Sequence, residues 1–182
     1  MMHHNHKKLK FNNKGFSLVE LLVVIAIMAI VIGGVITGVS VIVKGNVKKA
    51  GNNLYSELTG LRTQTLSVNA EWKLSLEKNG NKLSAVTYKS GAEHDRQDIC
   101  TGYSVMFYDY ETAGSAPAEY NLYDNTATFT YSKTNGRFQS IKVGENSIDV
   151  NKNLKGVIVL TKGSKTYTLT LWYNTGRITI DN

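Results

Sequence analysis

The chain has 182 residues, one cysteine and a formal net charge of +7. This length leaves room for about one domain beyond any membrane segment, and a single cysteine excludes an intramolecular disulfide. Four lysines and no acidic residue fall within residues 1–15, so this segment carries +4 of the charge and leaves +3 for the remainder. The charge distribution therefore argues against a generally basic nucleic-acid-binding surface.

Residues 21–43 form an unbroken apolar run that contains neither a charged residue nor a proline. As an α-helix this run would extend about 35 Å, which exceeds the ~30 Å hydrocarbon core of a bilayer. The lysines precede the run, so the positive-inside rule keeps the N-terminus in the cytoplasm and sends the following chain across. We therefore expect a single-pass membrane protein with an extracytoplasmic C-terminal part.

Two simpler kinds of segment share part of this pattern. A cleaved secretory signal has an apolar core of only about 7 to 15 residues and ends at a small-x-small site, which is not evident here. A plain signal anchor has no use for Glu20, which stands at the start of the run. A carboxylate in apolar surroundings is costly and needs a partner.

Cleavage between Gly15 and Phe16 would supply that partner. It creates an α-amino cation four residues before Glu20, about one helical turn away. Within one subunit the pair would lie at the start of the helix. In a stack of staggered helices the amine would instead reach the Glu20 of a neighbouring subunit, so the carboxylate would set the register of assembly.

The peptide KGFSLVELLVVIAIMAI, which begins at Lys14, resembles the N-terminal signature of type IV prepilins and of the pseudopilins of type II secretion and competence systems. The resemblance covers residues 7–45. It implies that a prepilin peptidase cleaves after Gly15 and methylates the amine of Phe16, and that Glu20 guides assembly. The implied partners are other pilin or pseudopilin subunits, the assembly platform and, before assembly, membrane lipid.

The apolar run departs from many major pilins, which carry a proline midway along it. Here the corresponding stretch contains Thr37 and three glycines, Gly33, Gly34 and Gly38. Glycine weakens a helix by about 1 kcal/mol relative to alanine, which favours local unwinding in a filament. The spacing of Gly34 and Gly38 equally suits close packing of membrane helices, and both interpretations stay open.

Helical periodicity continues after the apolar run, to about residue 69. Apolar or small residues recur there at intervals of three and four: Val47, Ala50, Leu54, Leu58, Leu61, Thr65 and Val68. The opposite face is polar, with Lys48, Lys49, Asn52, Asn53, Glu57 and Arg62. This amphipathic helix should pack on a sheet, and its polar face is either solvated or in contact with neighbouring subunits.

From Trp72 onward the apolar residues alternate with polar ones, as in β-strands. Residues 72–76 and 83–88 flank the turn Asn79-Gly80-Asn81 and predict a hairpin. Further strands are predicted at 103–110, 126–131, 137–143, 157–161, 166–173 and 177–180. Two long connections, 90–101 and 111–125, are expected to be loops that either contact a partner or are simply solvated.

These elements predict an α+β fold in which a long N-terminal helix precedes an antiparallel β-sheet head. The expected domain organisation is a cytoplasmic leader (1–15), a transmembrane and assembly helix (16–43), an amphipathic extension (44–70) and an extracytoplasmic head (71–182). The helix, the strand order and short fragments over residues 54–182 also resemble the GspH and FimT group of minor pseudopilins.

The head offers no catalytic constellation, so we expect a structural protein without a cofactor or metal. The cluster of Glu93, His94, Asp95 and Asp98 lies in an expected loop and is read as solvated rather than metal-binding. Cys100 is read as a small buried hydrophobe rather than a reactive thiol. His3, His4 and His6 resemble a metal-binding tract but belong to the leader.

Two rival functions remain. One is DNA binding during uptake, which some FimT-like proteins support through basic residues; the candidates here are Arg137, Lys162, Lys165 and Arg177. The other is a surface enzyme tethered by a pilin-like anchor, for which no residue gives a positive signal. The sequence favours a structural subunit of a type IV pilus or of a secretion or competence pseudopilus.

Overall fold

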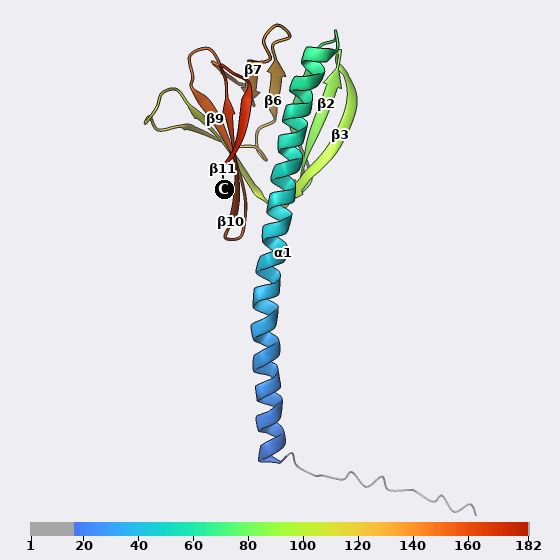
Figure 1. Ribbon diagram of the computed structural model, residues 1–182, viewed down its shortest axis with the longest axis vertical. Coiled ribbons are helices and arrows are strands. Elements are labelled where there is room, and N and C mark those ends of the chain that lie inside the picture. Colours follow the sequence, from blue (N-terminus) through green and yellow to red (C-terminus); the bar gives the residue numbers. More distant parts are fainter. Residues whose placement is uncertain (1–16, 182) are drawn as a thin grey trace, which may run out of the picture. The chain divides into compact units, whose positions relative to one another are not determined.

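The computed structural model describes the backbone of residues 17–181 and the side chains of residues 17–30 and 45–181. This part of the chain contains one long helix, α1 (Leu18–Ser67), followed by eleven strands. The chain divides into two compact units, with the boundary between Ser40 and Val41. The second unit holds the C-terminal part of α1 and all the described strands (Figure 1).

The strands form two antiparallel sheets. The first sheet contains β1 (Trp72–Asn79), β2 (Lys82–Lys89), β3 (Ala92–Thr101), β6 (Ala127–Tyr131), β7 (Phe138–Val143) and β8 (Asn146–Ile148), in the order β3-β2-β1-β6-β7-β8. The second contains β4 (Ser104–Tyr110), β5 (Ala118–Asn121), β9 (Lys155–Lys162), β10 (Lys165–Trp172) and β11 (Arg177–Asp181), in the order β11-β10-β9-β4-β5. The α+β class is confirmed, and the head consists of two sheets.

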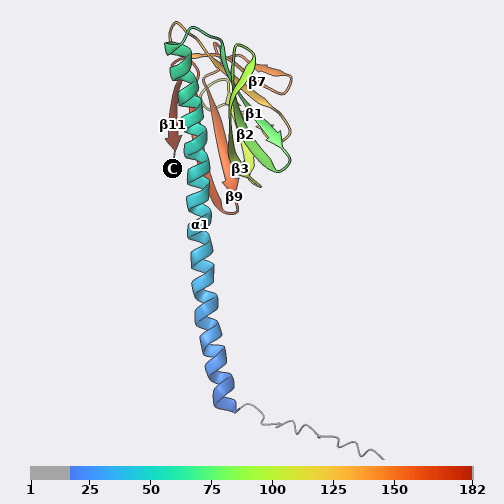
Figure 2. The ribbon, with the colours of Figure 1, turned by 90° about the vertical axis from the view of Figure 1, so that its right-hand side faces the viewer.

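The C-terminal part of α1 packs into the core of the head. Its predicted apolar face is buried, at Val47, Ala50, Leu54, Leu58, Leu61 and Thr65, and joins residues of both sheets in one core. Val68 is an exception, 40% exposed, because α1 ends at Ser67. Figures 1 and 2 show this part of α1 beside the strands, with β11 on one side and β2 and β3 on the other.

Specific contacts fix α1 against the strands at two levels. Near its middle, Gly51 lies directly against the ring of Tyr167 in β10, and the Tyr167 hydroxyl donates to Asn52 Oδ1 at 2.5 Å. About three helical turns later, Arg62 Nε donates to the carbonyl of Gly136 at 2.7 Å, and its Nη2 donates to the carbonyl of Thr175 at 3.3 Å. Arg62 therefore joins the β6–β7 turn to the β10–β11 turn.

Most predicted strands exist close to the expected bounds, and the β1–β2 hairpin turns at Gly80 and Asn81 as predicted.

The prediction of two long loops, at residues 90–101 and 111–125, is partly wrong. Strand β3 runs through the first, and β5 lies in the second. Residues 93–98 are polar and exposed or half-buried, so they lack the alternation that marks a half-buried strand. Backbone pairing to β2, with two register shifts, forms β3 instead. The short β8 was also missed.

A buried carboxylate in the second sheet accepts hydrogen bonds from two residues distant in the chain. Asp109 in β4 is 6% exposed. Its Oδ1 accepts a hydrogen bond from the Tyr173 hydroxyl at 2.8 Å. Its Oδ2 accepts a hydrogen bond from Asn153 Nδ2 at 2.5 Å. Burial raises the pKa of Asp109, while these two hydrogen bonds lower it and Glu111 raises it. Gly156, opposite Asp109 in β9, leaves the room needed, because a Cβ there would meet the Tyr173 hydroxyl at 2.6 Å.

Gly51→Ala should destabilise the head. The added Cβ would overlap the ring of Tyr167, and overpacking of this kind costs about 1 to 3 kcal/mol. Gly60→Ala, in the same helix and with no atom within 4 Å of the added Cβ, should instead stabilise by about 0.5 to 1 kcal/mol. Thermal denaturation of the full chain in detergent measures both. Equal shifts for the two variants would contradict the close packing of α1 on β10.

Asp109→Asn should change how stability depends on pH. A carboxyl whose folded pKa is raised binds its proton more tightly in the folded state, so its contribution to the free energy of unfolding falls as pH rises from about 4 through the folded pKa. The thermal midpoint of the variant relative to the parent should therefore rise across that range. Glu145→Gln, at an exposed turn, is the matched control. A constant difference between Asp109→Asn and the parent would contradict this.

Candidate functional site

The start of α1 is closed by a reciprocal pair of hydrogen bonds. The backbone N–H of Ser17 donates to Glu20 Oε2 at 2.9 Å, and the backbone N–H of Glu20 donates to Ser17 Oγ at 3.2 Å. The N–H of Leu21 donates to the carbonyl of Ser17 at 3.2 Å. Ser17 is thus the N-cap, and together with Glu20 it forms a capping box that satisfies two backbone donors left without helical partners.

This cap holds the Glu20 carboxylate at the extreme end of the helix. Gly15 and Phe16, the predicted cleavage and methylation positions, lie outside the described residues. Phe16 directly precedes Ser17 in the chain, so a new terminus at Phe16 would begin one residue from the N–H that Glu20 already binds. The capping box therefore keeps the carboxylate beside the backbone of Ser17, the residue that follows Phe16. The spacing of Glu20 from Phe16 was predicted from the sequence, whereas the cap was not.

The first turns of α1 carry apolar side chains on every side. Exposed fractions range from 79% at Leu18 to 47% at Val24, and the exposed residues are Leu18, Val19, Leu21, Leu22, Val23, Val24, Ile25, Ile27, Met28 and Ile30. Among the residues that the structure describes, none covers this surface, and an exposed apolar surface of this kind is typical of a site that contacts other proteins or a membrane.

The predicted membrane span, residues 21–43, is described only in part. Across the described residues, we find no helix with both the length and the apolar character that a membrane crossing requires. The side chains at Gly33, Gly34, Thr37 and Gly38 lie outside the described set, so both interpretations of that stretch stay predictions. The basic leader and its histidines lie outside it as well.

The four basic residues proposed for DNA contact fall into two separate pairs. Lys162 and Lys165 face each other across the β9–β10 turn, and Lys162 Nζ lies 4.7 Å from the ring centroid of Tyr103. Arg177 lies opposite Trp172 in the β10–β11 ladder, seven residues along β10 from Lys165, or about 23 Å of strand. The backbone of Arg137 lies against Gly176, beside Arg177. The four residues do not form one patch.

The acidic cluster of β3 is dispersed among separate partners. Glu93 pairs with Arg96 at 2.8 Å, Asp98 pairs with Lys82 at 2.6 Å, and His94 packs edge-on against the Trp72 ring. Within the described residues, no group of three or more metal-ligating side chains converges. Cys100 is buried, its Sγ lies 3.6 Å from the Tyr123 hydroxyl, and burial raises the pKa of the thiol.

Comparison with known proteins gives one match. Residues 10–36 match the family model of the prokaryotic N-terminal methylation motif. No curated protein and no solved structure matches the chain. The matched segment contains the Gly15-Phe16 junction, the Ser17–Glu20 cap and the beginning of the apolar run. The motif thus supports a prepilin-type protein with a type IV pilin-like or pseudopilin-like role.

Proposed function

We propose that the chain is a structural subunit, a minor pilin or pseudopilin, of a type IV pilus or of a type II secretion or competence pseudopilus. The observation that carries this proposal is the methylation motif at residues 10–36. Prepilin peptidase cleaves after Gly15 and methylates Phe16, the apolar helix anchors the subunit in the membrane, and the head stands on the extracytoplasmic side. The role is structural and non-enzymatic.

Assembly proceeds through the exposed start of α1. Apolar side chains on all sides of residues 18–30 can exchange lipid for the helices of other subunits at little cost in apolar exposure. Glu20 is the only charged residue between Phe16 and Val43, so its pairing with the α-amine of another subunit fixes the register of the helices. An unpaired carboxylate in that environment is penalised, which selects the staggered arrangement.

Two variants separate the charge of Glu20 from its capping role. Glu20→Gln keeps a side chain that completes a capping box but removes the charge. Ser17→Ala keeps the charge and removes the hydroxyl that caps Glu20 N–H. We expect Glu20→Gln to enter sheared filaments about tenfold less than the parent, and Ser17→Ala to enter at near-parent levels. Immunoblots of filament and membrane fractions measure this.

Both variants should still be cleaved, which an N-terminal mass measurement checks. If Glu20→Gln assembles like the parent, charge pairing does not set the register. If Ser17→Ala fails as badly as Glu20→Gln while still being cleaved, the cap rather than the charge controls assembly.

The alternative role is DNA binding during uptake. It draws support from the neighbouring exposed residues Arg137 and Arg177, and less from Lys162 and Lys165 at the far end of β10.

Phosphate contacts weaken as salt rises, so the full chain in detergent should retain duplex DNA at low salt and release it at high salt. Arg137→Gln with Arg177→Gln should weaken retention more than Lys162→Gln with Lys165→Gln. No retention even at low salt would reject this role.

A further inference from the structure

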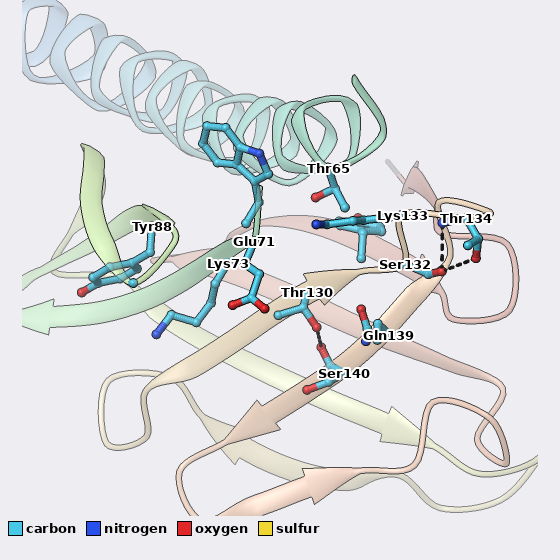
Figure 3. A pocket seen from close by; sticks show the side chains of 13 residues that line it. Thr65, Glu71, Lys73, Tyr88, Thr130, Ser132, Lys133, Thr134, Gln139 and Ser140 are labelled. Carbon is cyan, nitrogen blue, oxygen red and sulfur yellow. Dashed lines mark hydrogen bonds between the residues drawn. The ribbon is translucent and has the colours of Figure 1, made fainter. Parts of the chain in front are cut away.

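A pocket opens in the first sheet where β1 and β6 stop pairing. The register between them covers three residue pairs, from Leu74 opposite Phe129 to Leu76 opposite Ala127. Beyond the Leu74 pair lies a pocket of about 600 Å³, within the ~300 to 1,000 Å³ of typical small-molecule sites. It is bounded by the end of α1, the strands β1, β2, β6 and β7, and the β6–β7 turn (Figure 3).

Two residues that line this pocket each carry a buried donor without a hydrogen-bond partner in the described part of the chain. Trp72 is 6% exposed and Tyr131 is 2% exposed, and neither Trp72 Nε1 nor the Tyr131 hydroxyl has a hydrogen-bond partner among the described residues. The Tyr131 ring is stacked on Phe138 with centroids 4.4 Å apart, which holds the hydroxyl in place. Burial raises the pKa of Tyr131, so the hydroxyl keeps its proton and can donate.

Trp172 and Tyr173, two other aromatic residues with a polar atom, are paired. Trp172 Nε1 donates to Thr179 Oγ1 at 3.4 Å, and the Tyr173 hydroxyl donates to Asp109. Buried polar groups are satisfied in the great majority of cases, and an unpaired one lowers stability. Two such donors beside one pocket therefore favour an acceptor from outside the chain. Neither donor atom is accessible to solvent in this structure, so the acceptor would reach them through a movement of the pocket wall.

The charges around the pocket define the ligand further. Lys73 and Lys133 line it together with one carboxylate, Glu71, which leaves a charge of +1. Lys73 Nζ lies 4.4 Å from the ring centroid of Tyr88, and Lys133 Nζ donates to Asn69 Oδ1 at 3.5 Å. Neither lysine forms an ion pair within the described residues. A single negative charge on the ligand would complement this set.

Neutral polar groups complete the wall. Figure 3 shows the side chains of Thr65, Thr130, Ser132, Thr134, Gln139 and Ser140 around the pocket. Hydroxyl and amide groups both donate and accept, which suits a ligand that carries several hydroxyl groups. A phosphate dianion would exceed the available positive charge and would meet Glu71. We propose that this pocket binds a small polyhydroxylated monocarboxylate, the chemistry of a sugar acid.

Trp72 itself can report binding. The chain has two tryptophans, so Trp172→Phe leaves Trp72 as the only indole in the full chain, studied in detergent micelles. D-glucuronate, D-glucose and inorganic phosphate are titrated at constant ionic strength while Trp72 fluorescence is followed. D-glucuronate should give a saturable change, D-glucose should bind at least about tenfold more weakly because it lacks the charge, and phosphate should give no saturable change.

Tyr131→Phe in this reporter removes only the unpartnered hydroxyl. Affinity for D-glucuronate should fall about fivefold to tenfold, while the thermal midpoint without ligand should stay level or rise, because no internal hydrogen bond is lost. Tyr173→Phe is the matched control: its hydroxyl is partnered by Asp109 and does not line the pocket. It should lower the thermal midpoint and leave affinity unchanged.

Lys133→Gln should likewise weaken D-glucuronate binding, whereas Lys142→Gln, at an exposed position of β7 outside the pocket, should not. The proposal is overturned by the absence of a saturable response to D-glucuronate, by equal affinities for D-glucose and D-glucuronate, by binding of phosphate instead, or by unchanged affinity in Tyr131→Phe. The test needs no filament, so its outcome is independent of the proposed assembly role.

Discussion

The organisation of this chain depends on one helix that meets two different environments. Residues 18–30 of α1 are apolar on every side and exposed, whereas from Val47 onward only one face is apolar and that face is buried in the head. A helix of the first kind requires a non-aqueous partner, and a helix of the second kind requires a folded domain. In the described residues, one helix therefore carries an exposed apolar segment near its start and, from Val47 onward, a buried face that belongs to the core of the head.

The head meets this constraint with close contacts rather than covalent links, since Cys100 is the only cysteine. Gly51 allows β10 to approach α1, and Arg62 binds the carbonyls of two separate turns. Asp109 holds β4 to the end of β10 and the loop before β9. Together these contacts fix how the helix and the two sheets fit together.

Periodicity in the sequence was enough to predict the parts with one buried face. The buried positions from Val47 to Thr65 and the β1–β2 hairpin are confirmed because each has a clear period and, for the hairpin, a turn at Gly80. Strand β3 was not predictable in this way, because its exposed, polar residues 93–98 are held by backbone pairing to β2.

The candidate site was only partly visible in the sequence. The spacing of Glu20 from Phe16 is evident in the sequence. The S-x-x-E pattern from Ser17 to Glu20 is a sequence signal for a capping box, but the cap was not among the predicted features. The role of Arg62 and the unpartnered atoms of Trp72 and Tyr131 depend on residues distant in the chain, so no local pattern predicts them.

Processing at the Gly15-Phe16 junction is measured by intact mass spectrometry of the mature chain. If the chain is a prepilin, the mature form should begin at Phe16 and carry one added methyl group. A chain that retains Met1 in cells with active prepilin peptidase would rule this out.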